Sequence, residues 1–366
     1  MLLTKVVIPS LMLVLILYPS SLLGWSVLYG SNSLMAMAII SVLITGWSLV
    51  SKSLKDRAIF SAQKSLLVWI LFLLTLLLFF RLDTFLLREV IVVAVALLYF
   101  TGNRNNFSIV RRIFRFILIA SLGMYVFLQL IPYDFGTKPI HGPLNLRDSW
   151  GEADYYTVFG LLVDRVQNGR HFMRYSAHFL EPTWLWLFLF IFTDKVKENI
   201  IDFFLGLFSM AWFGLFTLLI GGIIIGLRRH FFKIIIVLTL LYYVLIDIVN
   251  INILTLKLDQ LLFMMEKDFF MLPDISLFGS LSESDRRFGL GILNIISKYG
   301  LVGMLLYLTL LFNNINIALR SENNFSKVIT IAFSIFTLKA GGFLIPHILY
   351  TISLKYDYNN DIVSTE

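Results

Sequence analysis

Charged and titratable side chains are concentrated in one polar stretch, residues 133–181, of an otherwise apolar sequence. Guanidinium, imidazole and carboxylate groups at this density can bind an anion and exchange a proton. The apolar segment from Pro182 to Phe192 follows at once. The sequence therefore predicts that this stretch binds a large anionic substrate at a membrane surface. Its charged and titratable residues include Arg147, Arg165, Arg170, His171, Arg174, His178 and Glu181.

Four of these residues follow one another at steps of four, four and three positions. Such steps place side chains on one face of a helix. Trp184 and Trp186 begin the next apolar segment, and tryptophan is typical of the membrane–water interface. A helix over 170–185 would then carry one stripe just above the lipid, made of Arg170, Arg174, His178 and Glu181. The alternative is an ordinary solvated face.

A second basic pair, Arg286 and Arg287, precedes a later apolar run. Ser282 and Asp285 have the spacing of a capping box, which predicts that a helix begins there. Arginine in a first turn opposes the helix dipole, so the pair is explained by an anion delivered to the free N–H groups of that turn. The alternative is that both arginines pair with neighbouring carboxylates or lipid headgroups.

The composition indicates what must position these groups. Hydrophobic residues make up 58% of the 366 positions and charged residues 14%, which is more apolar surface than a soluble domain can bury. Apolar runs of about 15–25 residues match a hydrocarbon core of about 30 Å. We therefore predict an all-α, polytopic integral membrane protein. Residues 1–366 would form one transmembrane domain of about 11–12 helices.

The charge and cysteine content exclude several classes of function. The net charge of +7 is explained by lysine and arginine in cytoplasmic loops, so we expect no nucleic-acid partner. The absence of cysteine excludes disulfides, thiol nucleophiles and thiolate metal sites. The pair Glu152 and Asp154 is too short a pattern to predict a metal. We expect neither a metal nor a cofactor.

Basic clusters orient the apolar runs. They predict a cytoplasmic N-terminus, a large periplasmic loop over 133–181 and a second periplasmic loop over 255–289. The run Ile200–Leu227 must fold back near Met210–Gly214, as a re-entrant-like hairpin, to return Arg228 to the cytoplasm. One long tilted helix is the alternative. The last run, Val328–Ile352, contains two adjacent glycines and is expected to be broken in two.

Three further interpretations concern single segments. Residues Tyr155, Phe159, Leu162 and Val166 recur at helical spacing, which predicts an amphipathic helix that ends at Asn168-Gly169. Arg88 and Glu89 are explained by snorkelling to an interface. Lys339, beside the two glycines of the last run, is harder to explain structurally, because charge is costly in lipid.

The segment Arg174–Pro182 resembles the arginine–aromatic–small–x–x–aromatic–x–Glu–Pro pattern of bacterial O-antigen and capsular polysaccharide polymerases. That family of membrane glycosyltransferases also includes O-antigen ligases. The order of spans and loops is similar over nearly the whole chain. One position departs from the pattern, since members often carry Ser-Arg at the tip of the hairpin and this chain has Ser209-Met210.

The resemblance implies a reaction in the bacterial inner membrane, with the active site on the periplasmic side. Undecaprenyl-pyrophosphate-linked oligosaccharide repeat units would be polymerised into O-antigen or capsular polysaccharide of the cell envelope. Glu181 or His178 would be the catalytic base. The pyrophosphate would be bound by Arg170, Arg174, Arg286 and Arg287. The substrates and membrane lipids are the implied partners, and the resemblance leaves open whether a chain-length regulator binds.

Two alternatives remain at this point. An O-antigen ligase would use the same chemistry to transfer finished glycan to lipid A-core. A lipid-linked oligosaccharide flippase, or another transporter, would instead carry charges through its spans around a central cavity. The concentration of charge in two loops disfavours the transporter.

Overall fold

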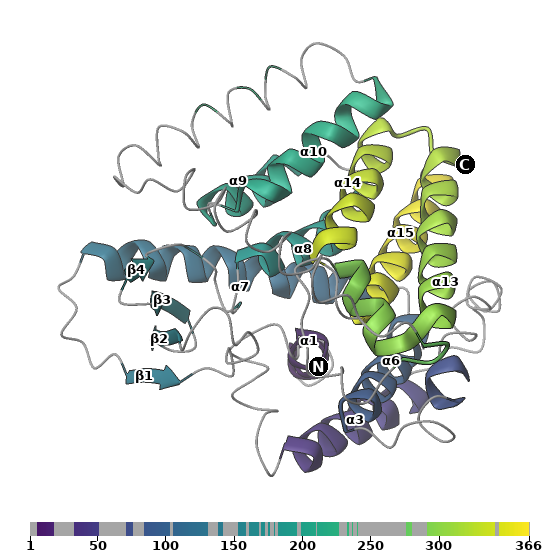
Figure 1. Cartoon of the computed structure of the whole chain (residues 1–366), viewed down its shortest axis with the longest axis horizontal. Coiled ribbons are helices and arrows are strands. Elements are labelled where there is room, and N and C mark those ends of the chain that lie inside the picture. The colour runs from purple at the N-terminus through teal and green to yellow at the C-terminus, as the bar shows by residue number, and fades with distance from the viewer. Residues whose placement is uncertain are drawn as a thin grey trace.

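The fold is known from a computed structural model. It describes residues 6–17, 33–50, 71–75, 84–102, 105–130, 138–141, 153–158, 161–167, 170–172, 182–195, 199–209, 211–226, 276–279, 291–340 and 344–365, and the single positions 175, 179, 233, 236 and 240. The chain is mainly helical, with one small sheet at the edge of the helices (Figure 1). The helices are α1 (Ile8–Leu17), α3 (Ser33–Val50), α6 (Thr84–Gly102), α7 (Asn105–Leu130), α8 (Pro182–Phe192), α9 (Ile200–Phe208), α10 (Trp212–Ile225), α13 (Gly291–Arg320), α14 (Asn324–Ala340) and α15 (Leu344–Thr365).

Helices α13, α14 and α15 lie side by side, and α10 packs along α14 (Figure 1). Their inner faces combine apolar side chains with many hydroxyl groups. These hydroxyls mostly donate to a carbonyl one turn back in their own helix, as Thr330 does to Ser326 O at 2.8 Å. Hydroxyls paired in this way can be buried at low cost. They bring polarity into the core of the three helices without leaving unpaired donors.

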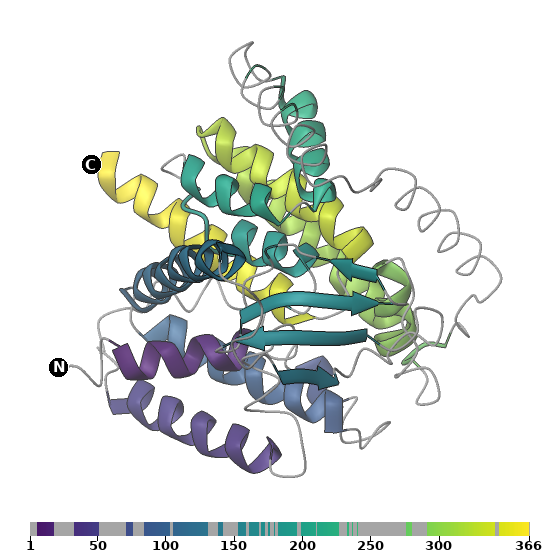
Figure 2. The same cartoon turned by 90° about the vertical axis from the view of Figure 1, so that its left-hand side faces the viewer.

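A four-stranded antiparallel sheet corrects the prediction of an all-α chain. Its strands are β1 (Lys138–His141), β2 (Ala153–Val158), β3 (Leu161–Gln167) and β4 (Arg170–Phe172), in the order β1-β2-β3-β4. Figure 2 shows the strands running across the face of the molecule. Strand β3 contacts α7, so the sheet is held against that helix.

The amphipathic helix predicted over 155–166 is therefore wrong. The sequence there reads equally well as two hairpins, because Val158 pairs with Leu161 and Gln167 pairs with Arg170, with two residues between each pair. Asn168-Gly169, interpreted above as a helix stop, is also the strongest short hairpin signal. Aromatic and β-branched residues favour strands, and they decide between the two patterns here.

The helices are interrupted near two predicted positions, and a third interruption was not foreseen. The predicted hairpin, which requires residues 200–227 to fold back on themselves, stays a prediction. Helix α9 ends at Phe208 and α10 begins at Trp212, and α14 ends at Ala340 four residues before Leu344 begins α15. The unforeseen break lies inside α13 at Gly300, where φ is 70° and ψ is −171°. A positive φ is unfavourable for any residue with a side chain, so only glycine fits there without strain.

One described helix, α13, is long and apolar enough to cross a membrane, which supports association with a membrane weakly. Helices α6 and α7 would add a second span if the pair, bent by 114°, counted as one. The remaining apolar helices among the described segments are shorter, for example α8 with 11 residues. The predicted total of about 11–12 spans is not confirmed.

Large apolar side chains are nevertheless exposed along one face of α13. Leu305, Phe312 and Leu319 are spaced by seven residues and are all exposed, with Phe312 at 67%. A seven-residue spacing returns to nearly the same face of a helix. Exposed apolar stripes of this kind mark contact with lipid or a partner.

Candidate functional site

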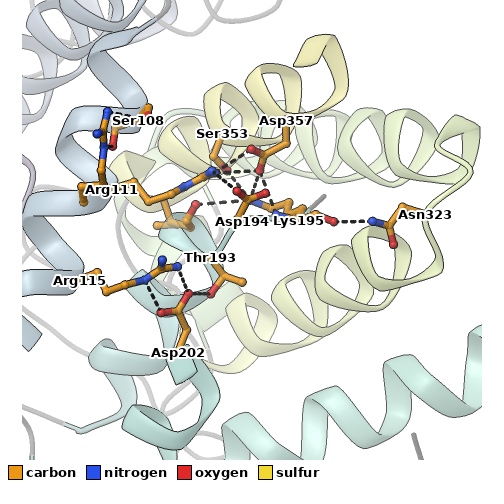
Figure 3. Close-up of polar contacts among 12 residues, drawn as sticks. Ser108, Arg111, Arg115, Thr193, Asp194, Lys195, Asp202, Asn323, Ser353 and Asp357 are labelled. Atoms are coloured by element: carbon orange, nitrogen blue, oxygen red, sulfur yellow. Dashed lines mark hydrogen bonds and ion pairs between the residues drawn. The ribbon is translucent and has the colours of Figure 1, made fainter. Parts of the chain in front are cut away.

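The best-defined polar site joins α7, the α8–α9 connection and α15, and we call it the ion cluster (Figure 3). Nη2 of Arg111 donates to both carboxylate oxygens of Asp357, at 2.8 and 2.9 Å. Nζ of Lys195 lies 3.5 Å from the same carboxylate and donates to Ser353 at 2.7 Å. Asp194 adds a longer ion pair, 3.6 Å from Arg111 Nη1.

A second ion pair, one turn along α7, belongs to the same cluster. Arg115 grips Asp202 through Nε and Nη2, at 2.9 and 2.7 Å. The hydroxyl of Thr193 donates to the same aspartate at 3.3 Å. This fork geometry is the strongest form of an arginine–carboxylate contact. The contact with Arg115 also explains why a charged residue, Asp202, is tolerated in the first turn of the apolar helix α9.

The charges of the ion cluster balance. Its described members are three cations and three carboxylates, namely Arg111, Arg115, Lys195, Asp194, Asp202 and Asp357. Burial is the main reason that the pKa of Lys195 falls to about 8, and Asp357 opposes the fall. Asn323 donates to Lys195 O at 2.9 Å, which ties in the α13–α14 turn. A balanced cluster that joins four segments is suited to holding helices together.

The family-like segment is fixed to the helices by two aromatic side chains. The Tyr175 hydroxyl donates to Leu118 O at 2.8 Å and lies 2.7 Å from Ser121 Oγ. The Phe179 ring packs on Phe188, with ring centres 5.3 Å apart. Both anchors are 1% exposed. Tyr175 and Phe179 therefore both pack against α7, and Phe179 also packs against α8.

The predicted helical stripe over 170–185 is wrong. Arg170 lies in β4, opposite Gln167, and α8 begins only at Pro182. The turn signals before β4 and the helix-starting proline explain why no continuous helix forms. The other predicted site residues lie outside the described residues, so their convergence stays a prediction: Arg174, His178, Glu181, Arg286 and Arg287.

A buried carboxylate links the break in α13 to the start of α15. Glu89 of α6 accepts a hydrogen bond from the Tyr299 hydroxyl and another from Leu344 N at 3.3 Å. Glu89 is 2% exposed, so the interpretation of this residue as snorkelling is wrong. A carboxylate at a helix N-terminus is stabilised by the helix dipole and the free N–H groups.

A short loop segment fits against the break in α13. Leu301 N donates to Ser276 O at 3.0 Å, and Val302 N donates to Leu277 O at 3.2 Å. These bonds satisfy backbone donors that the break at Gly300 leaves without intrahelical partners. Non-helical backbone at membrane depth is tolerated only where protein or a water-filled cavity surrounds it.

Glycines on both sides of the break between α9 and α10 pack against one tryptophan, Trp186. A Cβ on Gly206 would lie 2.7 Å from Trp186 Cζ2, and one on Gly214 would overlap the five-membered part of the same ring. Glycine is therefore required on both sides of the break. Lys339 Nζ lies 4.3 Å from the centre of the Phe213 ring, next to Gly214. We call Trp186, Phe213, Lys339 and this break the break site.

The ion cluster and the break site lie toward opposite ends of the helices. At about 1.5 Å per residue, Lys339 is about 22 Å along α14 from Asn324. By the same measure, Leu344 is about 20 Å along α15 from Asp357. The basic clusters predict that the end with Arg111 is cytoplasmic. The break site and Glu89 would then lie toward the periplasmic side.

Comparison of the sequence with models of known families, with curated proteins and with solved structures finds no match. The similarity described above therefore rests on the quoted residues and on the order of the elements.

Sequence reasoning missed both buried sites, for different reasons. Arg111 and Asp357 are 246 positions apart, so no local spacing relates them. Gly206 and Gly214 flank the expected break and could have indicated a bulky partner, but nothing in the sequence points to Trp186. Lys339 was singled out for its cost in lipid, and the structure brings it to the break.

Proposed function

We propose that this protein is a multi-pass inner-membrane glycosyltransferase that polymerises lipid-pyrophosphate-linked oligosaccharide repeat units on the periplasmic side. The observation that carries the proposal is the family-like segment 174–182. Its two described residues that precede α8, Tyr175 and Phe179, are buried against the helices. A motif that binds substrate needs such a rigid support.

The proposed chemistry needs an anion site and a base. A lipid pyrophosphate leaves as the acceptor sugar hydroxyl attacks, and bidentate arginine contacts stabilise the leaving charge without a metal. Arg174 and Arg286 are proposed to make these contacts. Glu181 or His178 is proposed to take the hydroxyl proton. Removing one well-placed donor to developing charge costs about 3–4 kcal/mol of barrier.

Alanine substitution of Arg174, Arg286 and Glu181, one at a time, tests the assignment. At matched protein levels each variant is expected to lose the long polysaccharide ladder on a gel and to leave single-repeat glycans. Long ladders in all three variants would reject these residues as the site.

A flippase for lipid-linked oligosaccharides is the second candidate, and the structure provides a specific reason to keep it. Buried charges within the helices, such as Glu89, and helices broken at buried positions are typical of transport proteins. A deletion strain separates the two. A polymerase defect leaves single repeats at the cell surface, whereas a flippase defect accumulates lipid-linked repeats on the cytoplasmic side. An O-antigen ligase defect would leave unligated polymer on its lipid.

A further inference from the structure

The N-cap residue of α10 offers no side-chain cap to the first turn, and Ser209 Oγ accepts only from Ala211 N, at 3.3 Å. Helix α10 has 14 residues, and its N-cap residue is Ala211, which makes no capping hydrogen bond through its side chain. The Gly214 N–H donates only weakly back to Ala211 O, at 3.2 Å. The first N–H groups of a helix have no intrahelical acceptor and carry a partial positive charge.

A buried side-chain donor lies at the same break. Trp186 is 0% exposed, and its Nε1 has no hydrogen-bond partner. Cβ atoms on Gly206 and Gly214 would both fall within 2.8 Å of Trp186 Cε2, the ring atom bonded to Nε1. The indole ring therefore lies between the last turn of α9 and the first turn of α10. A buried indole N–H normally has an acceptor, so its lack of one points to a ligand.

A cation completes the set. Lys339 lies in the last turn of α14, and its Nζ stands over the Phe213 ring in the first turn of α10. The ring face attracts the ammonium group and holds it near the N-terminus of α10. Three kinds of donor thus lie around the break: an ammonium, an indole N–H and helix N–H groups. Such a set favours an anion rich in acceptor oxygens.

We propose that the break site binds the diphosphate of an isoprenyl-linked substrate, with Lys339 as the counter-charge and Trp186 Nε1 as a donor. The inference rests on the proposed function and deepens it, because it places a diphosphate contact outside the arginines considered so far. It also supplies positive charge at a break between helices where Ser209-Met210 provides none. The break site lies toward the end of the helices where the lipid-linked substrate would be handled.

The test measures binding of farnesyl diphosphate to the purified full chain in detergent, by titration calorimetry. We expect binding by the wild type and a loss of about tenfold or more in Lys339→Gln, because a charge-assisted contact is removed. Lys339→Arg is expected to keep the affinity within about threefold. Trp186→Phe, with its folding checked by melting temperature, should weaken binding by about tenfold. Lys327→Gln, at the opposite end of α14, is the matched control and should bind like the wild type.

Further ligands separate the sources of the anion. Inorganic pyrophosphate should compete, and farnesol should not. Equal binding of farnesol would overturn the inference, because the lipid chain alone would then be recognised. Equal competition by phosphatidylglycerol vesicles would also overturn it, because the site would bind any anionic headgroup.

The outcomes distinguish this inference from the proposed function. If the wild type binds farnesyl diphosphate and Lys339→Gln binds equally well, the break site is wrong and the proposed function stands. If the wild type binds no diphosphate, both are rejected as stated. If Lys339→Gln loses binding while the deletion strain shows a flippase defect, the site stands and the polymerase assignment fails.

Discussion

The ion cluster and the break site are both buried and polar, yet they differ in how their polar groups are matched. Every carboxylate of the ion cluster faces an arginine or lysine, and the cluster joins α7, the α8–α9 connection, α9 and α15. The break site instead gathers donors, among them Trp186 Nε1 without an acceptor. The paired charges of the ion cluster hold helices together, although Arg111 Nε has no partner there. At the break, the Trp186 N–H is a donor without an acceptor. Under the proposed function, the ion cluster has a structural role and the break site binds substrate.

The largest expected effect comes from unbalancing the ion cluster. Asp357→Ala would leave Arg111 and Lys195 facing each other in a buried site. Breaking a buried pair from one side costs about 3–5 kcal/mol of stability. We expect a large fall in the free energy of unfolding, measured by denaturation in detergent. Asp194→Asn is the control: Asp194 is 26% exposed and pairs at 3.6 Å, so its loss should cost less than about 1 kcal/mol.

If both variants lose the same stability, the ion cluster does not depend on Asp357 as described. The ion cluster would then not have the structural role that distinguishes it from the break site.

The packing at the break site predicts the next largest effect. Gly214→Ala would drive a methyl group into the Trp186 ring, and overpacking of a core costs about 1–3 kcal/mol. Gly123→Ala meets no atom within 4 Å and lies inside α7, so it should be neutral or stabilising by about 0.5–1 kcal/mol. Melting temperatures of the two variants should move in opposite directions. Equal shifts would show that the glycine is not needed for contact with Trp186.

The anchor of the family-like segment should contribute less. Tyr175→Phe keeps the ring and removes the hydroxyl that contacts Leu118 O and Ser121. A buried hydrogen bond is worth about 1 kcal/mol. We expect a stability loss of that size together with shorter polysaccharide at equal protein levels. Ser121→Ala in the Tyr175→Phe background should add little, and full additivity would argue against the contact.

A pH dependence of stability is also expected, and it originates in the ion cluster. The folded state lowers the pKa of Lys195 from 10.5 to about 8, mainly through burial. A lowered pKa means that the folded chain releases this proton at a lower pH than the unfolded chain does. Its contribution to stability is complete above the unfolded pKa and is lost as the pH falls through about 8.

The melting temperature of the wild type should therefore rise relative to Lys195→Met as the pH increases from about 8 toward 10. A constant difference between the two proteins would contradict the lowered pKa.

Local signals in the sequence foretold the helix breaks better than the polar sites. The two glycines after Ala340, and the prediction that Arg228 is cytoplasmic, pointed to breaks near the positions where the helices are interrupted. The strands were misread because helical spacing and hairpin turns coexist over residues 153–172, and turn chemistry prevailed. The break at Gly300 has no comparable signal, since one glycine in an apolar helix is common.

The polar sites depend on contacts between residues far apart in the chain. Glu89 adjoins Arg88, and the pair was therefore interpreted as interfacial. Glu89 is buried instead, and its partner Tyr299 lies 210 positions away in the sequence. The same holds for Lys339, whose neighbour Phe213 comes from a different part of the sequence. Cost in lipid identifies such residues, but only the fold identifies their partners.

We propose that the two regions lie at opposite faces of a membrane. Because the chain has no cysteine, single substitutions Leu277→Cys and Glu322→Cys can be labelled without background. Leu277 is exposed beside the break in α13, and Glu322 is exposed in the α13–α14 turn near the ion cluster. A maleimide that cannot cross membranes should label Leu277→Cys in intact spheroplasts and label Glu322→Cys only after permeabilisation. Labelling of both positions from outside, or the reverse pattern, would contradict the account.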